Sequence, residues 1–230
     1  MGGQACVFYG AAEFSRDCDI VIIADDENLR RLDRALAELQ AECIALPVYD
    51  RRFWERGHAI HFRCHHPDCN GIRLDIMTTM RGCEPFETLW KRRMSVEDDA
   101  GMVYELLGIE DLVNAKKTQR DKDWPMIQRL VDAHYDEFQL NPTEDQIRFW
   151  LRESRTPEVL IRLSAAYPEH CRQLSTTRAL LCDASTGDMD LLRKRLRDEE
   201  TLERVADENY WRPLKAELQF LREQRQRKTN

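Results

Sequence analysis

Two aspartates stand at the entry to the most strand-like segment of the chain. Asp17 and Asp19 are separated by one residue and lead into the apolar run of residues 20–24. Successive side chains of a β-strand point to opposite faces, so Asp17, Asp19 and Val21 share one face and the residues between them share the other. If the apolar face enters the core, the two carboxylates project together, roughly 7 Å apart along the strand.

A third aspartate occupies a similar place in a later segment. Asp75 lies between two apolar residues of segment 71–77 and points away from both of them. If this strand lies beside the first, the three carboxylates form one cluster. Like charges this close repel unless a cation lies between them, and hard divalent ions such as Mg²⁺ take carboxylate oxygens. The alternative is that Asp17 and Asp19 only discourage pairing at a strand edge.

A glycine pair precedes the first two aspartates. Gly2 and Gly3 are separated from Asp17 by 13 residues, and residues 4–12 have a helical composition. Adjacent glycines before a helix let backbone N–H groups approach a triphosphate. A glycine pair, then Asp-x-Asp, then a single later aspartate is more specific than any one of these features alone.

The rest of the pattern predicts an α+β chain. Residues 28–42 carry leucines at helical spacing, and segments 58–65 and 71–77 alternate as two strands joined by a turn-rich stretch. Residues 44–49 are predicted as a short strand or an extended loop. Residues 84–93 are predicted as a connecting segment, and helices are expected from residue 95 onward. We therefore predict two domains. A mixed β-sheet with helices spans 1–138, and an all-helical C-terminal unit spans 139–230.

Composition excludes several classes of protein. The chain has 230 residues and a formal net charge of −7, so its total charge does not favour generic binding to nucleic acid or membrane. No apolar run approaches the ~20 residues of a membrane-spanning helix, and no signal peptide is evident. The eight cysteines are scattered without a C-x-x-C pair, which favours reduced thiols and a cytoplasmic location.

Residues 1–135 resemble the DNA-polymerase-beta-like nucleotidyltransferase superfamily, in particular its small bacterial, toxin-like members. The matching motifs are Gly2-Gly3, Asp17-Cys18-Asp19 and Asp75. The segment IEDLVNAKKTQRDKDW also resembles the helix that follows the catalytic sheet in those members. The resemblance implies a nucleotidyltransferase-type sheet.

The resemblance also implies roles for individual residues. Asp17, Asp19 and Asp75 would be catalytic and would bind two Mg²⁺ ions. The residues implied to bind the nucleotide are Gly2, Gly3, Ser15, Lys116 and Arg120. For Lys116 and Arg120, which can share a helix face, the alternative is a solvated surface paired with nearby aspartates.

The implied activity is Mg²⁺-dependent transfer of a nucleoside monophosphate from a nucleoside triphosphate such as ATP, with release of pyrophosphate. The acceptor would be a hydroxyl of an RNA, a protein or a small molecule. The protein would be a toxin paired with an antitoxin. The alternative is a non-catalytic binding or regulatory module of the same fold. Domains of this kind have a helix and a strand before the glycine pair. Here Met1 directly precedes Gly2, so we expect the catalytic domain to lack both.

Residues 58–69 contain four histidines and two cysteines. Their spacing is not that of a zinc finger or ribbon. Strand alternation puts His58 and Cys64 on one face and His61 and His65 on the other, so a structural zinc site is the less favoured interpretation. The other interpretation is that His61 or Arg63, on the strand beside Asp75, reaches the substrate.

Overall fold

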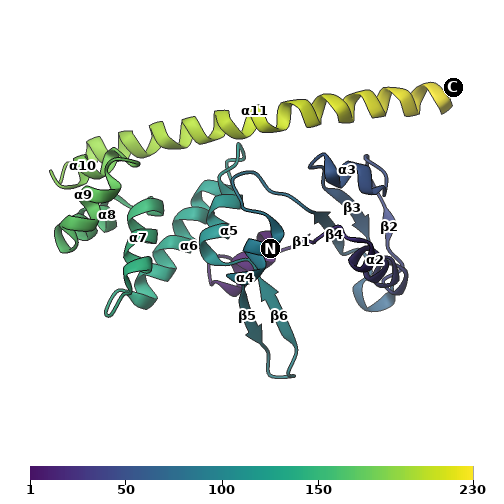
Figure 1. Cartoon of the computed structure of the whole chain (residues 1–230), viewed down its shortest axis with the longest axis horizontal. Helices are drawn as coiled ribbons and strands as arrows, with labels where there is room; N and C mark the ends of the chain where they lie inside the picture. The colour runs from purple at the N-terminus through teal and green to yellow at the C-terminus, as the bar shows by residue number, and fades with distance from the viewer. Residues whose placement is uncertain (230) are drawn as a thin grey trace. The chain divides into compact units, whose positions relative to one another are not determined.

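The computed structural model of the protein describes residues 1–229 (Figure 1). By packing, these residues form two compact units. The first comprises residues 1–8, 12–115 and 208–229, and the second comprises residues 9–11 and 116–207. This division differs from the boundary at residue 138 that the sequence suggests, which stays a prediction.

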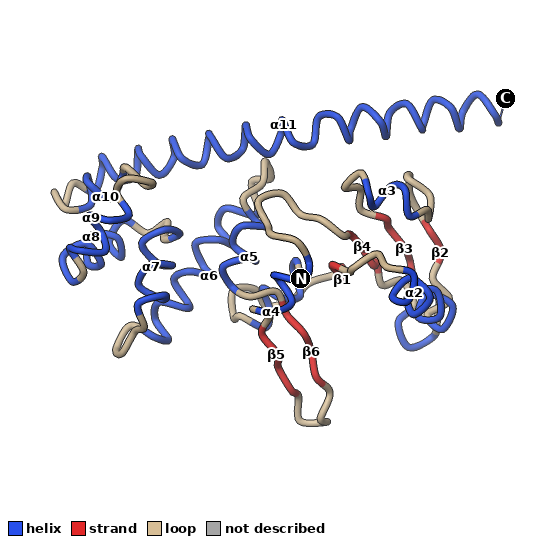
Figure 2. Tube along the Cα trace, viewed as in Figure 1, coloured by secondary structure: helices blue, strands red, loops and turns tan. Residues whose placement is uncertain are grey.

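The first unit is α+β and contains two small sheets (Figure 2). Its elements are α1 (Gly2–Phe8), β1 (Asp17–Val21), α2 (Asp26–Glu38), β2 (Glu42–Cys43), α3 (Arg51–Glu55), β3 (Ile60–Arg63), η1 (Pro67–Cys69), β4 (Arg73–Met77), α4 (Phe86–Lys91), β5 (Met94–Glu97), β6 (Val103–Leu106), most of α5 (Ile109–Lys116) and the C-terminal half of α11 (Met189–Thr229).

The larger sheet has the strand order β1-β4-β3-β2. β1 pairs with β4 in parallel, whereas β3 pairs antiparallel with both β4 and β2. The predicted strands at 58–65 and 71–77 are therefore confirmed, and η1 lies in the turn between them. The expectation that the first strand lies beside the strand of Asp75 is confirmed as well.

One face of this sheet forms the core of the first unit. Ile60, Leu74 and Ile76 are buried there, and the leucines of α2 pack against them. Trp54 of α3 is fully buried, and its indole Nε1 donates a hydrogen bond to the carbonyl of Ile76 at 3.0 Å. The apolar face of β1 follows the prediction at Cys18, but Ile20 is exposed.

Helix α2 (Asp26–Glu38) lies at the predicted helix of residues 28–42 and begins two residues earlier. The side chain of Asp25 accepts a hydrogen bond from the backbone N–H of Asn28 at 2.7 Å, which caps the helix. Asp26 and Glu27 lie in the first turn, where negative charge is stabilised by the helix dipole.

The region of residues 84–106 differs from the prediction. The expected connector contains α4, and the expected change to helices at residue 95 is wrong because β5 and β6 form an antiparallel hairpin there. Gly101 closes this hairpin with a φ of 78°, a value that favours glycine. Nearly every residue of β5 and β6 is exposed, so the alternation of apolar and polar residues that marks a strand is weak.

The second unit is helical, as predicted for the C-terminal part. Its helices are α6 (Asp123–Phe138), α7 (Glu144–Glu153), α8 (Pro157–Ala166), α9 (Pro168–Leu174), α10 (Leu180–Ala184) and the N-terminal half of α11 (Met189–Thr229). Trp150, Leu160 and Leu163 are buried in its core. Within this part, the sequence pattern predicts single helices over residues 168–184, 187–198 and 200–224. The first is interrupted between α9 and α10, and the last two are one continuous helix, α11.

Within residues 1–229, no helix has both the length and the apolar content of a membrane span.

We expect Trp54→Phe to lower the free energy of unfolding by about 1–3 kcal/mol, because the carbonyl of Ile76 loses its buried donor. Trp90→Phe is the matched control, since Trp90 is 44% exposed and should change stability by less than about 0.5 kcal/mol. Urea unfolding followed by circular dichroism measures both. Equal stability of the two variants would contradict the role given to Trp54.

Candidate functional site

The three predicted carboxylates project from one face of the larger sheet. In the parallel pair of β1 and β4, Asp19 lies opposite Asp75 and Asp17 lies opposite Arg73. Residues opposite one another on neighbouring strands point to the same side. The arrangement expected from strand alternation is therefore present, with Asp17, Asp19 and Asp75 on the face opposite the core.

Asp75 is held by two basic side chains. Its Oδ1 lies 2.7 Å from Nε of Arg73 and 2.8 Å from Nδ1 of His61. Burial alone would raise the pKa of Asp75, but the hydrogen bonds from His61 and Arg73 outweigh it, so the pKa lies below its ordinary value. Asp75 is therefore a stable carboxylate at neutral pH.

His61 extends the row of polar groups across a third strand, because it lies opposite Asp75 in the β3–β4 pair. Its Nδ1 is also 3.1 Å from Nη2 of Arg73. One ring nitrogen cannot both donate and accept, so the contact with Asp75 requires the proton on Nδ1, and the contact with Arg73 requires its absence. Moving that proton would shift His61 from one partner to the other.

The glycine pair lies directly against this site. Gly2 has a φ of +68°, and a Cβ added to it would stand 1.8 Å from Oδ2 of Asp19. The backbone N–H of Gly3 points to the same oxygen at an N···O distance of 3.4 Å. A Cβ on Gly3 would stand 2.3 Å from Oγ of Ser15. The main chain at both positions thus approaches the site more closely than any side chain would permit.

Ser15 supports the start of β1. Its hydroxyl donates a hydrogen bond to the carbonyl of Asp17 at 3.0 Å, and the side chain of Gln4 donates to the carbonyl of Ser15 at 3.2 Å. Gly2, Gly3, Ser15, Asp19 and Asp75, which the resemblance assigned to one site, are therefore brought together within the first unit.

The fit of this site to Mg²⁺ is mixed. Two carboxylates on alternate positions of β1, Asp17 and Asp19, are the oxygen donors that a hard cation prefers. Asp75, in contrast, has Arg73 and His61 as partners. Within residues 1–229, no three His, Cys, Asp or Glu side chains are gathered in a way that could hold a metal ion. Asp17 and Asp19 thus suit the ion, and Asp75 would join them only after exchanging its partners.

Lys116 and Arg120 contact a common carboxylate in the second unit. Nζ of Lys116 lies 3.5 Å from Oδ1 of Asp123, and Nε of Arg120 lies 2.7 Å from Oδ2. Asp123 is buried, and it also accepts a hydrogen bond from Thr118 at 2.6 Å. The alternative that Lys116 and Arg120 pair with a nearby aspartate is therefore formed. Their assignment to nucleotide binding stays a prediction.

The histidines and cysteines of residues 58–69 are dispersed as strand alternation predicts. Cys64 is buried in the core, whereas His58 is buried beside Glu217 with its Nε2 2.9 Å from Oε2. His61 is on Asp75. Among the residues described, no three His, Cys, Asp or Glu side chains of this stretch are gathered in a way that could hold a metal ion, and the zinc interpretation stays a hypothesis.

Arg73 is the residue of the site that sequence reasoning missed. It stands two residues before Asp75 on the same strand, so alternation alone places both side chains on one face. That signal was present. The importance of Arg73 becomes clear only from the strand pairing, which sets Asp17 opposite Arg73.

A comparison of the chain with models of known protein families and with curated protein sequences finds no match.

We expect Gly2→Ala to destabilise the protein more than Gly71→Ala. Both glycines have positive φ, so both variants bear the backbone cost of about 1–2 kcal/mol. Only Gly2 has a neighbour to displace, because no atom lies within 4 Å of a Cβ at Gly71. Urea unfolding compares the two variants. An equal loss of stability would show that Gly2 does not press against Asp19.

The lowered pKa of Asp75 makes its contribution to stability pH-dependent. A carboxyl whose folded pKa lies below its unfolded value of about 3.9 stabilises the fold above that value, and this stability is lost as pH falls through the folded pKa. The difference in free energy of unfolding between the wild type and Asp75→Asn should be constant above about pH 5 and shrink below about pH 4. Urea unfolding at a series of pH values tests this. A difference that grows on acidification would contradict it.

Proposed function

We propose that the protein is a nucleotidyltransferase that uses Mg²⁺ to transfer a nucleoside monophosphate from a nucleoside triphosphate to an acceptor hydroxyl. The observation that carries the proposal is the approach of the Gly2–Gly3 main chain to Asp19, where no Cβ fits. A close main chain beside a carboxylate is what a site needs to bind phosphate oxygens and a cation together. The fold of the first unit, on this proposal, is of the nucleotidyltransferase type.

Asp17 and Asp19 are the residues that would hold Mg²⁺. The ion, when bound, would neutralise phosphate charge and lower the pKa of the acceptor hydroxyl. The backbone of Gly2 and Gly3 would orient the triphosphate, which keeps the α-phosphorus in line with the incoming oxygen.

The reaction forms a bond between the acceptor oxygen and the α-phosphorus and breaks the bond from that phosphorus to the oxygen bridging to the β-phosphate. Pyrophosphate leaves with that electron pair. The proton of the hydroxyl passes to solvent by way of the carboxylate of Asp75, which holds it only transiently because its pKa is lowered, and His61 and Arg73 hold that carboxylate in place. The acceptor would be a hydroxyl of an RNA, a protein or a small molecule. Action as a toxin held in check by an antitoxin partner is part of the same proposal.

The second candidate is a binding module that has the same fold and does not catalyse transfer. The observation that favours it is the pairing of Asp75 with both Arg73 and His61, which supplies within the chain the positive charge that a metal would otherwise provide. Such a module would bind nucleotide without transferring it, so a transfer assay separates the two candidates.

We expect Mg²⁺-dependent transfer of label from α-labelled nucleoside triphosphates to a mixed RNA and protein extract. Asp17→Asn and Asp19→Asn should each lower the rate at least about 100-fold, since each removes a carboxylate that would hold the Mg²⁺ ion. Asp68→Asn is the matched control, because Asp68 is a 90% exposed side chain in the turn between β3 and β4 and should have no effect.

Sensitivity of the label to ribonuclease or protease identifies the acceptor class. Nucleotide binding without labelling by any of the four triphosphates would favour the binding module. Labelling that survives both aspartate substitutions would contradict the assignment of the site.

A further inference from the structure

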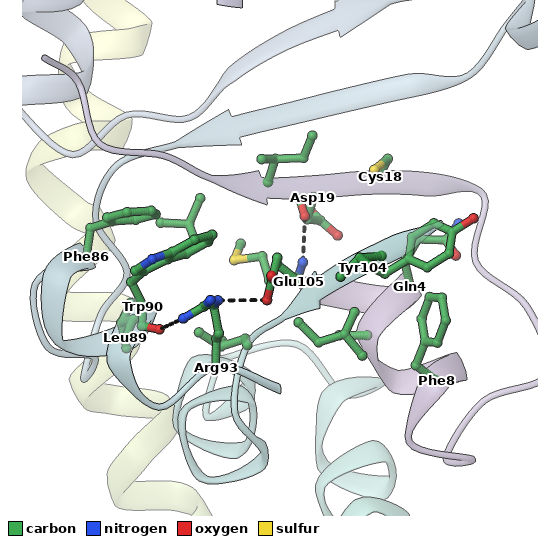
Figure 3. Close-up of a pocket in the computed structure, with 17 residues that line it drawn as sticks. Gln4, Phe8, Cys18, Asp19, Phe86, Leu89, Trp90, Arg93, Tyr104 and Glu105 are labelled. Carbon is green, nitrogen blue, oxygen red and sulfur yellow. Dashed lines mark hydrogen bonds and ion pairs between the residues drawn. The ribbon is translucent and has the colours of Figure 1, made fainter. Parts of the chain in front are cut away.

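A cavity of about 430 Å³ adjoins the carboxylate site along β1 (Figure 3). It is bounded by α1, β1, α4 and β6, all within the first unit, and Asp19 is one of its lining residues. The cavity is thus continuous with the place where the proposed triphosphate would bind, and its lining is predominantly apolar.

The walls of this cavity carry aromatic side chains that are unusually exposed. Trp90 is 44% exposed, Phe8 is 42% exposed and Tyr104 is 38% exposed. Large apolar side chains gathered in one exposed place mark binding sites more often than they mark a solvated surface. In Figure 3, Phe86 and Trp90 lie on one side of the cavity and Phe8 and Tyr104 on the other, with Asp19 between them.

The aromatic wall is already arranged for stacking. Phe86 and Trp90 are stacked at a centroid distance of 5.7 Å and an interplanar angle of 18°. The guanidinium carbon of Arg93 lies 4.0 Å from the centroid of Trp90. Two edge contacts fix that guanidinium, one to Glu105 and one to the carbonyl of Trp90, both at 2.7 Å. A guanidinium held by its edges, with one face against Trp90, presents its other face, and nucleic-acid bases stack on such planes as well as on aromatic rings.

We infer that this cavity binds the heterocyclic base of the nucleotide, stacked against the Trp90–Arg93 wall and facing Tyr104. The inference rests on the proposed function, because that function places the phosphates beside Asp19. Stacking recognises any base by its π-face, so the site selects a nucleoside from other phosphate esters and discriminates weakly among the four bases.

The test measures base binding apart from phosphate binding. One arm titrates the full chain with adenosine, guanosine, cytidine and uridine in the absence of Mg²⁺. The other titrates it with inorganic tripolyphosphate and Mg²⁺. Calorimetry reports both, and circular dichroism checks the fold of each variant.

Trp90→Ala removes the ring that backs the Arg93 guanidinium, and Tyr104→Ala removes the facing ring. Each should weaken nucleoside binding by about fivefold or more and leave tripolyphosphate binding unchanged. Trp90→Phe should retain most of the affinity because it keeps a ring. Phe14→Ala is the matched control, since Phe14 is 68% exposed in the same unit and does not line the cavity.

The two failures are distinguishable. Nucleosides that do not bind, or that bind equally to Trp90→Ala and wild type, would overturn the base site even if tripolyphosphate binds. Nucleosides that bind through Trp90 would support the base site even where tripolyphosphate and Mg²⁺ fail to bind, and that second result would count against the proposed transferase alone.

Discussion

The parallel pairing of β1 with β4 is the constraint on which the candidate site depends. Its register sets Asp19 opposite Asp75 and Asp17 opposite Arg73. A shift of one residue in either strand would turn its charged side chains into the core and its apolar ones to solvent, so burial of Leu74 and Ile76 enforces the register that the polar face uses. The position of the carboxylates is thus maintained by hydrophobic packing on the opposite side of the sheet.

The polar face also solves an electrostatic problem within the chain. Three carboxylates this close on two neighbouring strands would repel one another. Arg73 lies among them and offsets that repulsion. The pKa of Arg73 is raised, chiefly by its hydrogen bond to Asp75, and Asp17 and Asp19 add to the effect. Arg73 is therefore an internal countercation, and binding of a divalent ion would compete with it for the same negative charge.

Sequence reasoning recovered the parts of the fold that a strong period-2 pattern marks. Alternation in β1, β3 and β4 sufficed to place the carboxylates on one face and to predict the β3–β4 hairpin. It failed for β5 and β6, because strands exposed on both faces need no apolar alternation. It divided α11 near residue 199, where no glycine or proline interrupts the helix. The role of Arg73 depended on a partner strand more than 50 residues away in sequence, which no local pattern contains.

β1 is an edge strand of its sheet, and this position affects whether the sheets of two copies can pair. An edge strand offers backbone donors and acceptors to any other strand, and edge charges are a common protection against such pairing. Asp17 and Asp19 lie on that strand, so two copies approaching edge to edge would bring like charges together. The same two side chains that suit a cation would therefore also oppose edge-to-edge pairing of two copies, and a cation that neutralised them would weaken that opposition.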